Sequence, residues 1–126
     1  MSETYSTHFI FIKQLGQPCR MLLHYTDTKY EDTDYTFDKP ELWANAKAKN
    51  EFRLDFPNLP YWVDGDIKLT QSTAIMRHLA RKHSLYGLTD VQASEIDMLI
   101  DTSVDLKMGL ILAVFGDFVS KFYLII

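Results

Sequence analysis

The stretch of sequence that decides the fold is Leu54–Ser72, LDFPNLPYWVDGDIKLTQS. Tyr61–Val63 and Ile67–Leu69 are rich in residues that favour strands, and Asp64–Gly65 between them is typical of a tight hairpin turn. Pro60 precedes the first strand, where an X–Pro bond can be cis and hold a sharp corner of the backbone. The stretch therefore predicts two antiparallel strands entered through a proline corner.

The residues after this hairpin predict a helix whose start can hold an anion. Gln71–Ser72 follows Thr70 and opens an amphipathic run that we expect to continue to His83. Free backbone amides at a helix start, together with an N-cap hydroxyl, bind groups such as a carboxylate. The loop before Pro60 can offer its backbone to an extended, peptide-like ligand. The segment thus has the parts of a small binding site.

The residues upstream predict a strand, a helix and a second strand. Thr7–Ile12 is an apolar, β-rich run, and Gln14–Gly16 breaks it. Pro18 stands where proline favours a helix start, and Lys29–Phe37 is expected to form the next strand. Such an order predicts a right-handed parallel crossover, and a short helix is expected over Pro40–Asn50. With the hairpin and its helix, the fold class is α/β, with the thioredoxin-like βαβ-ββα arrangement.

The residues downstream predict a linker and a long helix. Ser84–Leu88 is polar and contains a glycine, and Thr89 with Gln92 forms a capping box. Apolar residues then recur at helical spacing to about Phe115, where Gly116–Asp117 is expected to interrupt the helix. The apolar residues that follow could form a strand or a helix fragment.

We expect two domains on this basis, a thioredoxin-like domain over residues 1–83 and the start of an all-α domain over residues 89–126. The whole sequence has 126 residues, of which 47% are hydrophobic and 24% charged, as in soluble globular proteins. The net charge of −4 gives no electrostatic case for binding nucleic acid. We expect no membrane span, no secretory signal and a cytoplasmic location.

The single cysteine excludes an internal disulfide bond and suits a reducing compartment. Cys19 follows Pro18 near a predicted helix start, where the helix dipole can lower the pKa of a thiol; the alternative is a buried, inert side chain. His78 and His83 lie five residues apart, off one helix face, so they do not predict a metal site.

The quoted stretch resembles the glutathione-binding domain of the cytosolic glutathione transferases. DFPNLPY followed by TQS resembles the mu class in particular. The resemblance extends through Gln17–Leu23 and His78–His83, and it fades after about Phe118. It implies glutathione as a substrate, small electrophiles as its reaction partners and no metal.

The resemblance also implies roles for individual residues. Trp43 and Lys47, four residues apart on one helix face, would grip the glycine end of glutathione. Gln71 and Ser72 would hold its γ-glutamyl carboxylate, two loop residues would flank its peptide backbone, and an aspartate would reach it across a dimer. The implied glutathione-binding residues are Trp43, Lys47, Asn58, Leu59, Gln71, Ser72 and Asp105. A homodimer is implied in which Phe56 plugs into the partner subunit.

The sequence lacks the hydroxyl groups that the resembled family uses for catalysis. The mu class activates the thiol with a tyrosine hydroxyl whose position is Phe9 here, and a second aromatic hydroxyl on the electrophile side falls at Phe115. A hydrogen bond to a charged group contributes about 1.5–3 kcal/mol, which equals roughly one to two units of thiol pKa. Thr7 lies on the same face of the expected strand as Phe9 and has a hydroxyl. It could replace the missing donor only if a β-bulge brought it closer, and nothing in the sequence demands such a bulge.

The predicted function is conjugation of glutathione to electrophiles with low activity. The alternative is a non-catalytic glutathione-binding or partner-binding protein that lacks the thiol-activating hydroxyl. A third interpretation is a variant too incomplete to fold stably alone, because members of the resembled family continue with further helices and the second domain here is expected to be truncated. An uncovered apolar helix flank would then be a sticky surface.

Overall fold

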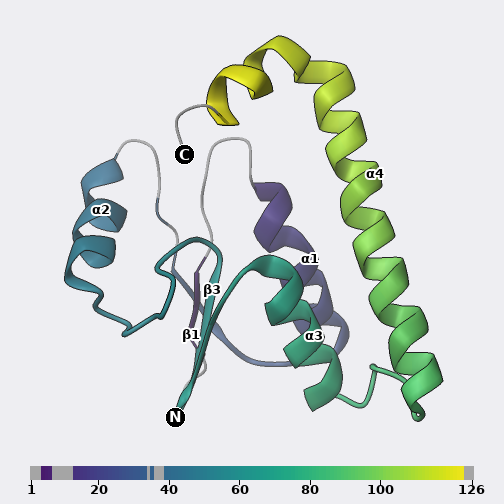
Figure 1. Ribbon diagram of the computed structural model, residues 1–126. Coiled ribbons are helices and arrows are strands. Elements are labelled where there is room, and N and C mark those ends of the chain that lie inside the picture. The colour runs from purple at the N-terminus through teal and green to yellow at the C-terminus, as the bar shows by residue number, and fades with distance from the viewer. Residues whose placement is uncertain (1–3, 7–12, 34, 36–38, 124–126) are drawn as a thin grey trace. The chain divides into compact units, whose positions relative to one another are not determined.

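A computed structural model of the chain describes residues 4–6, 13–33, 35 and 39–123. The chain divides into two compact units, Met1–Leu85 and Tyr86–Ile126. The second unit contains one helix, α4 (Asp90–Tyr123). The elements of the first unit, drawn in Figure 1, are β1 (Thr4–Ser6), α1 (Lys13–Tyr25), β2 (Glu31–Thr33), α2 (Pro40–Lys49), β3 (Tyr61–Asp64), β4 (Ile67–Thr70) and α3 (Ser72–Lys82).

The described strands form one sheet in the order β2-β1-β3-β4. β1 runs parallel to β2 and antiparallel to β3, and β3 and β4 form an antiparallel hairpin. The parallel pair is connected through α1, and the hairpin leads directly into α3. The predicted βαβ-ββα, thioredoxin-like α/β fold is therefore confirmed, and a long helix follows it.

Neighbouring side chains of β3 face opposite sides of this sheet, as the pleat of a strand requires. Trp62 is fully buried in a core cluster with residues of α1 and α3. Tyr61 is also fully buried, but its ring packs against Trp43 of α2. Accordingly, Figure 1 shows α1 and α3 on one side of the sheet and α2 on the other. The core cluster consists of Cys19, Leu23, Trp62, Ile75 and Leu79.

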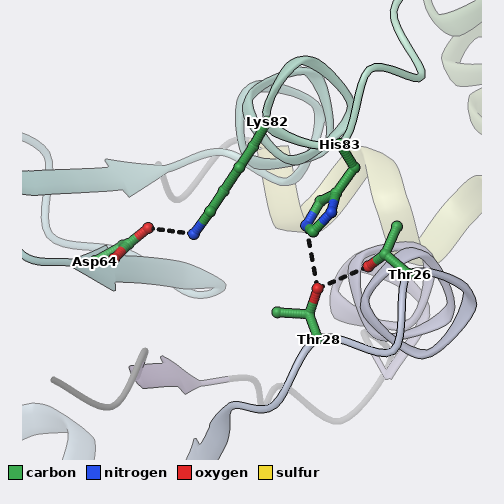
Figure 2. A network of polar contacts seen from close by, with 5 residues as sticks. All are labelled: Thr26, Thr28, Asp64, Lys82 and His83. Atoms are coloured by element: carbon green, nitrogen blue, oxygen red, sulfur yellow. Dashed lines mark hydrogen bonds and ion pairs between the residues drawn. The ribbon is translucent and has the colours of Figure 1, made fainter.

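Polar contacts join the ends of the helices that cover this core (Figure 2). The hydroxyl of Thr28 lies 2.8 Å from that of Thr26 and 3.1 Å from Nε2 of His83, so the turn after α1 is tied to the end of α3. Lys82 Nζ lies 2.7 Å from a carboxylate oxygen of Asp64 and links α3 to the end of β3. Both side chains of this ion pair are partly exposed, so it contributes at most about 1 kcal/mol.

An arginine fork connects α1 to the edge strand β2. Nε and Nη2 of Arg20 donate to the two carboxylate oxygens of Asp32 at 2.7 and 3.2 Å. Burial raises the pKa of the nearby Tyr30 phenol, the negative charge of Asp32 raises it further, and Arg20 partly offsets both. The two-pronged bond links α1 to β2, two elements of the parallel crossover.

Three boundaries in the first unit differ from those expected. α1 begins at Lys13, so Pro18 lies inside the helix and the prediction that it starts the helix is wrong. A proline inside a helix removes one backbone hydrogen bond and crowds the carbonyl four residues earlier, at a cost of about 3 kcal/mol, yet α1 continues through it. The loop of the hairpin is Gly65–Asp66, one residue later than expected, and Gly65 has the positive φ of 60° that its first position requires. The predicted strand over Thr7–Ile12 lies outside the described residues.

The second unit begins with a well-defined cap. The amide of Gln92 donates to the Thr89 hydroxyl at 3.2 Å, and the amide of Leu88 donates to the Gln92 side chain at 2.7 Å. Thr89 therefore caps α4 as predicted, although Gln92 reaches one residue further back than in the usual capping box. Gly87 has a φ of 80°, and a Cβ there would lie 2.7 Å from Cβ of Gln92, so only glycine fits.

The rest of α4 corrects the expected interruption at Gly116–Asp117, because the helix continues to Tyr123. A glycine in a helix interior costs about 1 kcal/mol relative to alanine, which is too little to end a long helix by itself. Within the described residues, no helix is both long enough and apolar enough to cross a bilayer.

The core cluster predicts that two apolar residues of the first unit contribute very differently to the free energy of unfolding. Leu79→Ala removes a fully buried side chain from the cluster, so we expect a loss of about 2–5 kcal/mol in the free energy of unfolding. Met21→Ala, at a side chain that is 64% exposed, is expected to change it by less than about 1 kcal/mol. Urea unfolding followed by tryptophan fluorescence measures both. Equal losses for the two variants would contradict this packing.

Candidate functional site

The segments that carry the predicted site meet at one end of the β3–β4 hairpin. Tyr61 pairs with Thr70 across the hairpin, so the loop that ends at Pro60 lies beside the start of α3. The ring of Trp43 stacks on that of Tyr61 with centroids 6.3 Å apart, which places α2 against the same strand. The structure therefore brings three segments together: α2, the loop before Pro60 and the start of α3.

The loop before β3 has the proline corner that the sequence predicts. The Leu59–Pro60 peptide bond is cis, and Pro60 is buried. Asn58 is exposed, and its side-chain oxygen accepts a hydrogen bond from the amide of Leu59 at 2.9 Å. A peptide ligand that bonded to the Leu59 amide would replace this local bond.

The start of α3 differs in one respect from the prediction. The N-cap is Gln71, and its side chain makes no capping bond, so the expected N-cap hydroxyl is absent from this position. Ser72 is the first helical residue and is half-buried. The thiol of Cys19, fully buried, donates to the Ser72 carbonyl at 3.5 Å. The first amides of α3 are therefore not capped by the residue that precedes them.

The backbone of Gln71 is strained. Its φ of 70° and ψ of 113° lie in a region that residues with a side chain rarely adopt, and the residue is exposed. Its carbonyl accepts the first bond of α3, from the amide of Ile75 at 3.0 Å. Strain of this kind persists where the surrounding structure enforces it, and it is frequent at ligand sites. Sequence patterns alone do not reveal it.

The α2 side of the site is built on aromatic packing. Trp43 is half-buried, and its ring packs against those of Tyr61 and Tyr35. The ring centroids of Trp43 and Tyr35 lie 5.3 Å apart. Lys47 follows one turn later and is exposed, so its ammonium group is accessible beside the packed tryptophan. Phe52 stacks on the same Tyr61 with centroids 4.5 Å apart. Sequence reasoning did not single out Tyr61 or Phe52 as parts of the site.

The structure does not test where the remaining predicted residues lie relative to these three segments. Asp105 is exposed on α4 in the second unit, and Phe115 belongs to the same helix, its side chain lying outside the described part of the chain. Phe9 and Thr7 also lie outside the described residues. Among the residues that the structure describes, no group of three or more His, Cys, Asp or Glu side chains is placed to hold a metal ion.

Comparison with known proteins identifies this arrangement. The family model described as "Glutathione S-transferase, N-terminal domain" matches residues 7–81, more than half of the chain. The chain belongs to the glutathione S-transferase family. Its similarity to the class-mu 26 kDa isozyme of Schistosoma japonicum is 47% identity over 98 residues, which cover 78% of this chain and 44% of that protein.

Other members of the family agree. Glutathione S-transferase Mu 2 of Mus musculus is 44% identical over 116 residues, covering 87% of this chain and 52% of its own. The structure of the pi-class glutathione S-transferase of Onchocerca volvulus superposes with a TM-score of 0.74 at 30% identity, covering 91% of this chain and 51% of that one. The chain thus spans about half the length of the glutathione S-transferases that it matches.

The strained backbone of Gln71 gives a direct test of this site. Gln71→Gly relieves the unfavourable φ and removes the side chain, whereas Gln71→Ala removes the side chain and keeps the strain. We expect the glycine variant to be more stable than the alanine variant by about 1 kcal/mol or more in urea unfolding. If Gln71 holds the γ-glutamyl carboxylate, as the resemblance implies, both should bind glutathione about tenfold more weakly in calorimetry. An alanine variant as stable as the glycine variant would contradict the strain.

Proposed function

We propose that this protein binds glutathione across its first unit and conjugates the glutathione thiol to small electrophiles at a low rate. The observation that carries the proposal is the meeting of three segments at one end of the β3–β4 hairpin. An exposed lysine beside a packed tryptophan, a cis-proline loop and the start of a helix are each suited to a different part of an extended, charged tripeptide.

Each part of the ligand has a matching part of the site in this proposal. The glycine carboxylate lies near Trp43 and Lys47, where the ammonium group supplies a positive charge. The cysteinyl backbone pairs with the loop at Asn58–Leu59. The γ-glutamyl carboxylate lies at Gln71 and Ser72, where the amides and the dipole of α3 favour a negative charge.

The low rate follows from the residue at the position of the family's catalytic tyrosine. Phe9 keeps an aromatic ring but has no hydroxyl to donate to the thiolate. Without that bond the thiol pKa stays near its ordinary value of about 8.5, so the thiolate is scarce at neutral pH. Positioning of glutathione beside an electrophile still contributes to the rate. No metal takes part in this reaction.

The second candidate is a glutathione-binding or partner-binding protein without catalysis. It is favoured by the same Phe9 and by Phe115, which lacks the hydroxyl expected on the electrophile side. This candidate keeps the full binding arrangement described above and differs only in turnover. Measuring binding and turnover separately distinguishes the two.

The proposed function also includes a homodimer and a cytoplasmic location. The side chain of Phe56 is 77% exposed beside the cis-proline loop, as a residue that inserts into a second copy of the chain would be. Asp105 of the partner would then approach the amino group of glutathione, and Phe115 would border the electrophile. Membership of the glutathione S-transferase family supports a cytoplasmic role in detoxification.

Restoring the hydroxyl tests the catalytic half of the proposal. We expect Phe9→Tyr to raise conjugation of an activated aryl halide about ten- to a hundredfold at neutral pH, because it lowers the thiol pKa by about one to two units. The midpoint of the pH–rate profile should move to lower pH by the same amount. Phe9→Leu, which removes the ring and adds no donor, should neither raise the rate nor move the midpoint of the pH–rate profile.

Capture on immobilised glutathione separates the outcomes of this experiment. Retention of the wild-type protein with turnover above background, raised further in the Phe9→Tyr variant, supports the proposed transferase. Retention with wild-type turnover at background would favour the non-catalytic candidate, whether or not the Phe9→Tyr variant turns over. A folded protein that glutathione does not retain would overturn both.

A further inference from the structure

Asn50 stands where the two halves of the proposed site are joined. It follows α2, which carries Trp43 and Lys47, and it precedes the segment that leads to the cis-proline loop. Its backbone is left-handed, with φ of 45° and ψ of 49°. This conformation ends a helix sharply, and asparagine adopts it more readily than most residues.

The backbone around Asn50 closes the last turn of α2. The amide of Asn50 donates to the carbonyl of Lys47 at 3.1 Å, and the amide of Glu51 donates to that of Ala46 at 3.1 Å. These are the two bonds of a Schellman motif, which satisfies carbonyls that the helix end would leave unpaired. The direction in which the chain leaves α2 is therefore fixed.

The side chain of Asn50 then fixes where the chain goes next. Its Nδ2 donates to the carbonyl of Leu54 at 3.0 Å, and its Oδ1 accepts from the amide of Leu54 at 2.8 Å. One side-chain amide thus bonds both backbone groups of a single residue. Leu54 is 3% exposed, so this bond anchors the start of the loop at a buried point.

Aromatic packing closes the connection from the other side. Between Asn50 and Leu54, Phe52 places its ring 4.5 Å from that of Tyr61, and Tyr61 stacks in turn on Trp43 of α2. The path from α2 through Asn50, the loop and β3 therefore returns to α2. Within this closed path, Trp43 and Lys47 keep a fixed relation to the loop that ends at Pro60.

We infer that Asn50 is a positioning residue. It holds Trp43 and Lys47, which bind the glycine end of glutathione in the proposed function, in place relative to the cis-proline loop. This inference rests on the proposed function and deepens it, because it concerns recognition of one end of glutathione. Asn50 itself does not touch the ligand. Its loss weakens the contacts that α2 makes and leaves those of Gln71 and Ser72 unchanged.

The test compares two ligands, glutathione and γ-glutamylcysteine, which lacks the glycine. Calorimetry gives the dissociation constant of each, and their ratio measures how strongly the protein prefers the glycine end. We expect the wild-type protein to prefer glutathione. Asn50→Gly keeps the left-handed backbone and removes the side-chain amide, so the preference should fall about fivefold or more, as when about one hydrogen bond is lost. Its affinity for γ-glutamylcysteine should stay within about twofold of the wild-type value.

Two further variants control this test. Asp27→Gly makes the same kind of change at another left-handed position, φ 49° after α1, and should leave the preference unaltered. Asn50→Asp keeps the acceptor for the Leu54 amide and loses the donor, so an intermediate preference is expected. If Asn50→Gly does not fold, Asn50→Asp carries the test, and an unaltered preference in it overturns the inference.

The remaining outcomes separate this inference from the proposed function. A folded wild-type protein that binds neither peptide overturns both. Wild-type binding with a glycine preference that Asn50→Gly leaves intact overturns the positioning role alone. Equal weakening of both peptides in Asn50→Gly also overturns it, because a general loss of structure would then explain the effect.

Discussion

The rest of the first unit depends on the pleat of β3, which sends two adjacent aromatic side chains to opposite faces of the sheet. Trp62 joins the core that α1 and α3 cover, and Tyr61 holds α2 through its contact with Trp43. Both side chains are fully buried. Because β3 also follows the cis-proline corner and leads through its hairpin into α3, the strand that organises the core also organises the site.

This arrangement separates binding from catalysis. The groups proposed to hold glutathione lie on α2, the loop before Pro60 and the start of α3, and all of these belong to the first unit. Phe9 and Phe115 stand at the positions where the resemblance to the mu class implies catalytic hydroxyl groups, and neither residue has a hydroxyl. In the proposed function, the chain keeps the groups that bind a charged tripeptide but lacks the donor that would lower the pKa of the thiol. The proposed function therefore predicts affinity without rapid turnover.

Most of the fold could be predicted from sequence because its signals are local. Strand-forming residues around a Gly turn predicted the hairpin, and Thr89 predicted the start of α4. The failures have physical reasons. Gly116 costs its helix only about 1 kcal/mol, and Pro18 removes one bond near the start of a helix whose later residues pack in the core, so neither ended its helix. In the site, the strain at Gln71 and the bonds from Asn50 to Leu54 arise only when the chain is folded, so periodicity and composition carry no trace of them.

The most direct test of the central claim is a titration of the ¹⁵N-labelled protein with glutathione, followed by two-dimensional NMR. The account predicts that shift changes concentrate on the amides of Lys47, Leu59 and residues 71–74, at the end of the hairpin where the three segments meet. It also predicts a change in one indole N–H signal, that of Trp43, with little change in that of the buried Trp62. Shift changes confined to other parts of the chain, or none at saturating glutathione in a folded protein, would contradict it.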